Sequence, residues 1–406
     1  MPNKNFLAEI KLIANKNKED NNIDFLDPEK MKDIKKFHSS IKEYKPTPLH
    51  NLKNLANYLG VKNIYIKDES YRFNLNSFKS LGGSYAIAKI LAEKLGKDIK
   101  KISFDYLKSE KAKNKLGKLT FTTATDGNHG RGIAWAASKL GHKAVIYLPK
   151  NSAKNRVEAI EAVGAQAVVT NLDYDKTVDF VLQKAEAENW ILVQDTARAE
   201  YLKIPHWIMQ GYTTMVQEVE LQLELEALEK ATHIFLQAGV GSMAAAILGY
   251  YQNLNTKNPI TTIIEPKEAA CFYESTAAAD SKAYKASGNL KTEMAGLACG
   301  EANPIAWNIL RDYADFFISC SDYPTARAMR ILANPIAKDQ KIISGESGAV
   351  GLGVLSLLME KKELKSLKEK LRLNQNSTLL FFNTEGATDK VNYRKIVWDG
   401  KNSLLD

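Results

Sequence analysis

The chain has 406 residues, of which 45% are hydrophobic and 25% are charged. These proportions are typical of a globular protein, and they exclude a mainly disordered chain or a collagen-like one. Three cysteines are too few for a disulfide-stapled secreted scaffold, so we expect a cytoplasmic protein with reduced thiols.

The net charge of +9 comes largely from residues 94–118, which hold nine lysines. A nucleic-acid binder would place such an excess beside aromatic residues in a recognisable module, and the sequence contains no such motif. The pattern favours a solvated helical face, and we expect no nucleic-acid partner. The most apolar stretch, residues 234–251, is interrupted by Gln237 and two glycines. It indicates a strand, a turn and a buried helix rather than a membrane span.

The first 43 residues form a polar, helix-prone arm, and Pro46 and Pro48 then interrupt regular structure. A β-type run at residues 63–67 and a helix at residues 83–95 follow. The pattern then alternates between apolar strands and amphipathic helices. We expect strands at residues 119–123, 144–148, 167–170 and 191–193, and helices at residues 129–140, 156–163 and 173–188.

A long helix at residues 207–229 leads into a second set of elements. We expect strands at residues 233–236, 260–265 and 379–383, and a helix at residues 243–253. Continuous apolar strands that alternate with helices indicate parallel sheets covered on both faces. The predicted fold is therefore α/β with two lobes, each an open parallel sheet with helices on both faces. We expect a large domain of residues 1–81 and 227–406 and a small domain of residues 82–226.

A glycine-rich turn, Gln237-Ala-Gly-Val-Gly-Ser-Met-Ala244, joins an expected strand to an expected helix. Backbone N–H groups and the helix dipole converge at such a turn, which makes it an anion site suited to phosphate. The glycines also fit a dinucleotide-binding pattern, with Glu265 in the place of a ribose-binding acid. By itself the turn allows a structural role, a phosphate site or a nicotinamide dehydrogenase.

Two further motifs precede expected helices. In Asn76-Ser-Phe-Lys-Ser-Leu-Gly-Gly83, Lys79 stands between an aromatic residue and a glycine pair. Partial desolvation there would lower its pKa and free an amine nucleophile, whereas the alternative is an ordinary surface lysine. In Thr122-Thr-Ala-Thr-Asp-Gly-Asn-His-Gly130, the turn offers hydroxyl and N–H donors to a carboxylate or a ring oxygen. A simple helix cap is the alternative there.

Taken together, these three motifs resemble the fold-type II pyridoxal-phosphate enzymes, which include the threonine and serine dehydratases and the tryptophan synthase β subunit. Within that family the chain is similar to the diaminopropionate ammonia-lyases over nearly its whole length. The stretches that carry the resemblance are residues 71–85, 124–132, 193–197, 204–212, 294–297 and 384–386.

The resemblance implies a tryptophan synthase β-like architecture, pyridoxal 5'-phosphate as the cofactor, and roles for the matching residues. Lys79 would bind the cofactor covalently, and Thr125 with the adjoining backbone would hold the substrate carboxylate. Asn128 would contact the ring hydroxyl of the cofactor, and Thr384 would face its ring nitrogen. The phosphate cradle would consist of Gly239, Val240, Gly241, Ser242 and Met243. We expect no metal ligand, and we interpret His129 as a packing residue.

The aspartate at position 126 indicates which kind of substrate the protein binds. It lies in the turn where a substrate carboxylate should bind, and two anions there repel each other. A second, cationic amine on the substrate would use this charge, and the resemblance places Asp195 near the same pocket. The implied reaction is the elimination of ammonia from 2,3-diaminopropionate, giving pyruvate and two ammonia. Lys79 would move a proton on one face for the L isomer, and Asp126 on the other face for the D isomer.

Other functions remain open at this stage. Another β-eliminating or β-replacing enzyme of the same family, such as a serine or threonine dehydratase, is the main alternative. A nicotinamide dehydrogenase would leave Lys79 and the Asp126 turn unexplained. Fold-type II enzymes are usually homodimers, so we expect a homodimer that binds a small-molecule amino acid and no membrane.

Overall fold

The computed structural model describes residues 7, 9–16, 19, 21–125, 127–198, 200–254 and 257–403. Asp126, one of the predicted site residues, lies outside the described residues. The chain divides into two compact units that it enters more than once. Unit 1 comprises Met1–Asp24, Thr47–Tyr71 and Glu218–Asp406, and unit 2 comprises Phe25–Pro46 and Arg72–Gln217. The domain boundaries expected from the sequence, near residues 81 and 226, remain a prediction.

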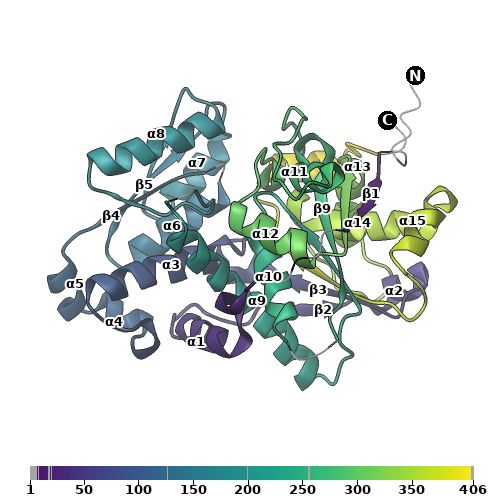
Figure 1. Cartoon of the computed structure of the whole chain (residues 1–406), viewed down its shortest axis with the longest axis horizontal. Helices are drawn as coiled ribbons and strands as arrows, with labels where there is room; N and C mark the ends of the chain where they lie inside the picture. Colours follow the sequence, from purple (N-terminus) through teal and green to yellow (C-terminus); the bar gives the residue numbers. More distant parts are fainter. Residues whose placement is uncertain are drawn as a thin grey trace. The chain divides into compact units, whose positions relative to one another are not determined.

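Unit 2 is built on a four-stranded parallel sheet in the order β6-β5-β4-β7. Its strands are β4 (Thr120–Ala124), β5 (Lys143–Leu148), β6 (Gln166–Val169) and β7 (Ile191–Leu192). Each lies within one or two residues of the strand expected from the apolar runs. In Figure 1, α8 and α6 lie on opposite sides of strands β4 and β5. The predicted parallel sheet with helices on both faces is therefore confirmed for this unit.

The helices of unit 2 are α1 (Pro28–Ser39), α3 (Lys79–Lys94), α4 (Phe104–Lys108), α5 (Glu110–Leu116), α6 (Asn128–Lys139), α7 (Lys154–Glu161), α8 (Tyr174–Ala187) and α9 (Lys203–Leu225), which continues into unit 1 after Gln217. Helices α6, α7 and α8 begin and end within two residues of the expected positions, whereas α9 begins and ends four residues earlier than expected. Helix α3 starts at Lys79, four residues before the expected start, because the backbone of Gly82 and Gly83 stays helical. Helices α3 and α6 cross closely, since a Cβ at Gly132 would lie 3.0 Å from the Cα of Ser80.

Unit 1 contains a seven-stranded sheet in the order β1-β10-β9-β8-β11-β3-β2. Its strands are β1 (Lys11–Ala14), β2 (Leu49–Asn51), β3 (Asn63–Asp68), β8 (His233–Gln237), β9 (Ile260–Pro266), β10 (Phe316–Cys320) and β11 (Thr378–Asn383). The five central strands are parallel, as predicted, but the edge strands β1 and β2 pair antiparallel. These edge strands are short and lack the long apolar run of a central strand, so periodicity did not reveal them.

The remaining helices belong to unit 1. They are α2 (Lys53–Leu59), α10 (Ser242–Gln252), α11 (Cys271–Ala278), α12 (Pro304–Tyr313), α13 (Tyr323–Ala333), α14 (Glu346–Glu360), α15 (Lys365–Lys370) and α16 (Lys390–Val397). Among the described residues, no helix is long and apolar enough to cross a membrane.

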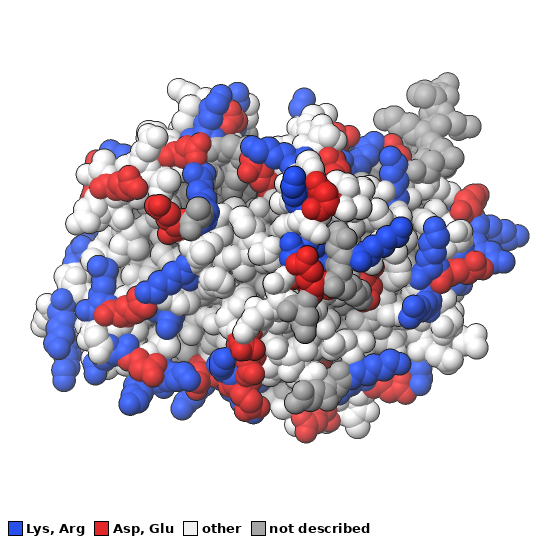
Figure 2. Space-filling view, in the orientation of Figure 1, with Lys and Arg blue, Asp and Glu red and all other residues white. Residues whose placement is uncertain are grey.

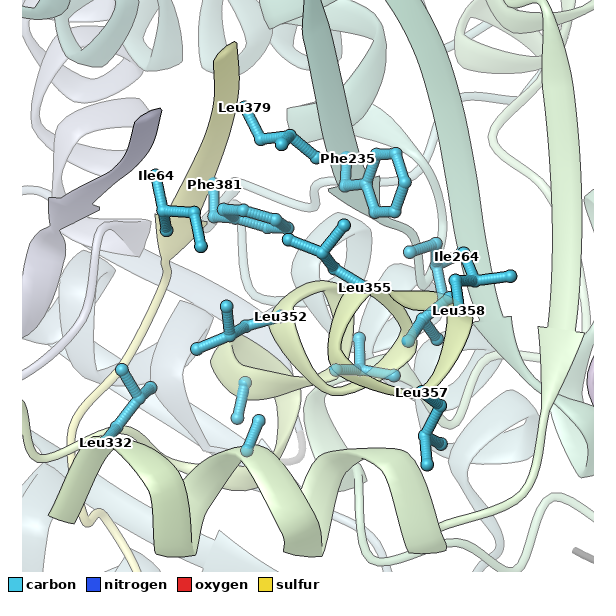
Figure 3. Packing of buried hydrophobic residues seen from close by; sticks show 14 of the residues in the cluster. Ile64, Phe235, Ile264, Leu332, Leu352, Leu355, Leu357, Leu358, Leu379 and Phe381 are labelled. Atoms are coloured by element: carbon cyan, nitrogen blue, oxygen red, sulfur yellow. The ribbon is translucent and has the colours of Figure 1, made fainter. Parts of the chain in front are cut away.

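The main core of unit 1 lies between its sheet and helix α14. Figure 3 shows Leu355 of α14 pointing toward Phe235 and Phe381 on neighbouring strands, with Leu352 and Leu358 of the same helix on either side of it, and all five are buried. Each fully buried leucine or phenylalanine contributes about 1.5–3 kcal/mol. This core fixes the strand ends of the unit, from which its predicted site residues extend.

The lysine-rich segment of residues 94–118 forms short helices on the surface of unit 2. Figure 2 shows Lys and Arg side chains with acidic ones among them. Several lysines pair with acidic residues, such as Lys113 with Glu110 at 2.9 Å and Lys100 with Asp33 at 3.1 Å. The segment therefore has the solvated, charge-paired surface that the sequence indicated.

Candidate active site

Lys79 is the first residue of α3, and its ammonium group meets a carboxylate from a distant part of unit 2. Its Nζ lies 2.7 Å from Oδ2 of Asp195, which follows strand β7. The Lys79 side chain is 20% exposed and that of Asp195 is 7% exposed. Nζ also lies 5.6 Å from the centre of the Phe78 ring. Lys79 is therefore a partly desolvated, paired lysine and not an ordinary surface lysine.

The loop that carries Asp195 is held by hydrogen bonds on both sides. The backbone N–H of Gln194 donates to the Tyr201 hydroxyl at 2.8 Å, and that hydroxyl donates to the Leu192 carbonyl at 3.1 Å. The Gln194 side-chain oxygen accepts a hydrogen bond from Thr123 at 2.7 Å. This clamp fixes the position of Asp195 beside Lys79.

Asp195 is held in its ionised form. Burial alone would raise its pKa, but the nearby Lys79 ammonium and His129 outweigh burial and hold the pKa of Asp195 below its ordinary value. An ionised carboxylate beside a lysine is the charge pattern that the resemblance implied for a pocket binding a cationic amine. The proximity of the two residues could not be read from their positions, which are 116 residues apart.

His129 is the residue whose contacts the sequence did not indicate. It is buried in α6, where its Nε2 donates to the Val193 carbonyl at 2.8 Å. Its Nδ1 lies 3.8 Å from Oδ2 of Asp195, the oxygen that also pairs with Lys79. The histidine packs, as expected, but it also faces the Asp195 carboxylate. Its position five residues after strand β4 was the signal that could have suggested this, because the ends of parallel strands meet at one edge.

The turn between β4 and α6 forms around Thr125. Its hydroxyl oxygen accepts hydrogen bonds from the N–H groups of Gly127 at 2.9 Å and Gly130 at 3.1 Å. Asn128 begins helix α6, so its side chain stands at the helix N-terminus. The turn is thus both a helix cap and a cluster of N–H and hydroxyl groups at the end of a strand. Because the threonine oxygen only accepts in these two bonds, its O–H group can still donate a hydrogen bond to a carboxylate.

In unit 1, the glycine turn joins β8 to helix α10. Gly239 and Val240 follow the strand, Gly241 precedes the helix with a left-handed φ of 88°, and Ser242 and Met243 form its first turn. The helix has no side-chain cap, in contrast to α12, which Asn303 caps. Instead, the Asn303 amide donates to the Ser242 hydroxyl at 2.9 Å. Backbone amides at the start of an 11-residue helix without a side-chain cap suit an anion, so the phosphate site expected at this turn stays a prediction.

We expect Gly241→Ala to destabilise the fold, with or without a ligand at the turn. A Cβ on Gly241 would lie 2.3 Å from Cζ of Phe272, and its φ of 88° strains any L side chain. The measurement is thermal unfolding of the cofactor-free protein, and Gly60→Ala is the control. Gly60 also has a positive φ, but no atom lies within 4 Å of a Cβ placed there. Equal midpoints for both variants would contradict the steric part of the argument.

Thr384 directly follows β11, the parallel neighbour of β8, so it lies one strand away from the glycine turn. Its hydroxyl oxygen accepts a hydrogen bond from the Gln237 amide at 3.1 Å, and the same amide donates to Phe382 at 2.9 Å. Because the oxygen already accepts, the hydroxyl proton remains for donation. A neutral donor of this kind fits an unprotonated ring nitrogen, which is the role that the resemblance gives to Thr384.

The residues therefore suit pyridoxal phosphate in each unit taken by itself. Unit 1 offers an uncapped helix N-terminus for a phosphate dianion and a threonine hydroxyl for a ring nitrogen. Unit 2 offers a partly desolvated lysine amine for the aldehyde carbon and an asparagine at a helix start for the ring hydroxyl. The chemistry of these donors is complementary to every polar group of the cofactor.

Glu265 has a different role from that of a ribose-binding acid. Its two carboxylate oxygens accept backbone N–H bonds from Phe272 at 2.9 Å and Tyr273 at 2.7 Å, so it caps helix α11. Burial raises the pKa of Glu265 to about 8, although these hydrogen bonds lower it. Because the buried Glu265 carboxylate already binds the backbone of α11, the dinucleotide-binding pattern lacks the acidic residue that would bind a ribose.

Comparison with known proteins agrees with these assignments at the level of the family. The family described as pyridoxal-phosphate dependent enzyme matches residues 41–371. The diaminopropionate ammonia-lyase of Escherichia coli (strain K12) is 50% identical over 372 residues, which cover 91% of this chain and 92% of that protein.

Two solved structures extend the comparison to the fold. The selenomethionine-containing holo diaminopropionate ammonia lyase from Escherichia coli has a TM-score of 0.91 and 47% identity, covering 97% of this chain and 98% of that one. The same enzyme in complex with an aminoacrylate-PLP azomethine reaction intermediate has a TM-score of 0.89, with the same identity and coverage. These findings confirm the predicted fold class and the resemblance. The chain belongs to the pyridoxal-phosphate dependent enzymes and, among them, to the diaminopropionate ammonia-lyases.

Proposed function

We propose that this protein uses pyridoxal phosphate to eliminate ammonia from 2,3-diaminopropionate, accepting the L and the D isomer. With one water, the substrate yields pyruvate and two molecules of ammonia. The observation that carries the proposal is the 50% identity to a diaminopropionate ammonia-lyase over 91% of the chain. The ionised Asp195 beside Lys79 supports it, because a substrate with a second ammonium group needs a fixed anion.

The cofactor, when bound, supplies an electron-poor ring that accepts electron density from the substrate Cα as its proton leaves. We assign the phosphate of the cofactor to the backbone of Gly239–Met243, its ring nitrogen to Thr384 and its ring hydroxyl to Asn128. Lys79 holds the aldehyde carbon. These assignments follow the donor chemistry of each residue and the positions of the strand ends.

The remaining site residues act on the substrate. Thr125 donates a hydrogen bond from its hydroxyl to the substrate carboxylate, and Asp126 and Asp195 bind the β-ammonium group. Lys79 takes the Cα proton of the L isomer, and Asp126 takes that of the D isomer from the opposite face. The β-ammonium group already carries the proton that lets it leave as ammonia, because a neutral amine is a far better leaving group than an amide anion.

The test is the visible spectrum of the purified protein, followed by addition of each diaminopropionate isomer. We expect an absorption band of covalently bound cofactor, and pyruvate and ammonia in a ratio of one to two. Serine and threonine serve as comparison substrates, since they lack the second cationic amine. Preferred turnover of either hydroxy amino acid would replace the proposal with a dehydratase function.

We also propose that the protein is a homodimer and that it works in the cytoplasm, where its three free cysteines stay reduced. Val391 and Trp398, seven positions apart at helix α16, are 64% and 73% exposed. Exposed apolar side chains on one helix face suit a contact with a second subunit. Light scattering at micromolar concentration should give twice the chain mass, and a single chain mass would contradict the dimer.

A further inference from the structure

In unit 2, the side chains of Lys79 and His129 both face the same carboxylate oxygen, Oδ2 of Asp195. Oδ2 of Asp195 lies 2.7 Å from Nζ of Lys79 and 3.8 Å from Nδ1 of His129. The histidine and aspartate side chains are 4% and 7% exposed. A buried carboxylate without a cation is costly, so at least one of its two neighbours must carry a positive charge.

The orientation of the His129 ring is set by its Nε2 atom, the ring nitrogen that does not face Asp195. Its Nε2 lies 2.8 Å from the Val193 carbonyl oxygen, which can only accept, so Nε2 carries a proton. The neutral ring therefore presents the lone pair of Nδ1 toward Asp195. The 3.8 Å separation is an ion-pair distance, and proton transfer requires the two atoms to approach to hydrogen-bond distance.

The two tyrosines near this carboxylate stay neutral, and the guanidinium of the nearby helix α6 binds a backbone carbonyl. Burial raises the pKa of Tyr201, which clamps the Asp195 loop, and it also raises the pKa of Tyr212 on α9, although Lys79 lowers the latter. Arg131 of α6 donates to the Leu75 carbonyl at 2.9 Å. Lys79 and His129 are thus two described residues beside Asp195 that can each carry the positive charge.

The proposed function requires Lys79 to lose a proton, because only the neutral amine can attack a carbonyl carbon. Asp195 opposes this step, since an anion at 2.7 Å favours the ammonium form. If the proton left for water, the buried carboxylate would lose the charge of its lysine partner. A second proton acceptor beside the same carboxylate removes this cost.

We propose that His129 is a positioning residue that takes over the positive charge beside Asp195 when Lys79 becomes a neutral amine. The N–H bond on Lys79 Nζ breaks and an N–H bond forms on His129 Nδ1, with the Asp195 carboxylate passing the proton between them. The charge of the three groups together stays at zero throughout. The inference rests on the proposed function in giving Lys79 the task of binding the cofactor.

Two variants separate this role from packing. His129→Gln keeps an amide N–H that can donate to the Val193 carbonyl, but it has nothing that can become charged beside Asp195. His129→Asn keeps an N–H near the Nδ1 position and loses the bond to Val193. If His129 only packs, the glutamine variant behaves as the wild type and the asparagine variant is impaired. If it carries charge, both are impaired.

The first measurement is the rate at which cofactor-free full-length protein captures pyridoxal phosphate, followed by visible absorption between pH 6 and 10. Without His129 the pKa of Lys79 rises, so its neutral form appears at higher pH. We expect the midpoint of the capture rate to move up by about one pH unit in His129→Gln, and the rate at pH 7 to fall about tenfold. A midpoint equal to that of the wild type overturns the proposal.

The second measurement is the titration of His129 by nitrogen NMR of the histidine-labelled, cofactor-free protein. The six histidines of the chain are few enough to resolve, and His129→Gln assigns the signal. In Lys79→Ala, Asp195 loses its lysine cation while His129 still faces the same carboxylate oxygen, so the pKa of His129 should rise by about one unit or more. In Lys79→Arg, which keeps a cation there, it should stay as in the wild type. Identical titration in all three proteins would reject charge sharing. This readout needs neither cofactor nor substrate, so a wild type that makes no pyruvate would overturn only the proposed function.

Discussion

Lys79→Ala is expected to abolish turnover and the visible absorption of covalently bound cofactor. The variant removes the amine that we propose to bind the cofactor and to accept the Cα proton of the L isomer. Loss of a catalytic nucleophile costs on the order of 10⁶-fold in other enzymes, and we expect a loss of similar size for L-2,3-diaminopropionate. The measurements are kcat for that substrate and the absorption spectrum of the purified variant.

Lys154→Ala is the matched control for this variant. Its ammonium group lies on the same unit but is 90% exposed and pairs only loosely with Glu158 at 3.6 Å. It should keep the spectrum and the turnover of the wild type. A Lys79→Ala protein that still shows covalently bound cofactor would mean that another lysine holds it.

Asp126→Asn is expected to separate the two isomers of the substrate. Asparagine keeps the shape of aspartate but cannot accept a proton, and general-base catalysis is worth about 10²–10⁴-fold. The kcat for D-2,3-diaminopropionate should fall by that factor, because Asp126 is the proposed base on the D face. The L isomer depends on Lys79 for proton removal, so its loss should appear mainly in KM, through weaker binding of the β-ammonium group.

D-serine is the control substrate for this variant. It has no second amine, so the wild type should turn it over poorly, and the loss of charge should affect its binding less. The test is kcat and KM for both diaminopropionate isomers and D-serine with the wild type and Asp126→Asn. Equal proportional losses of kcat for the two isomers would reject a base that acts on one face.

Much of the fold follows from the sequence alone. The apolar runs at β4, β5, β8, β9 and β11 predicted central parallel strands, because a strand buried on both faces must be apolar throughout. Glycine turns at the strand ends and the lysine beside a glycine pair were also visible, since each is a contiguous pattern. The resemblance to a known family that these patterns carry together named the cofactor, the family and the residues assigned to the site.

Only the tertiary structure decided which of those residues meet. Lys79 and Asp195 are 116 residues apart, and their contact depends on how β7 pairs with β4 and how α3 packs on α6. The position of His129 against the same carboxylate arises from the same packing, so its contact could not be seen in a motif read by itself. The antiparallel edge strands likewise lack a local signature. Sequence patterns record the burial of each element, whereas charge pairing depends on distances that only the packed elements define.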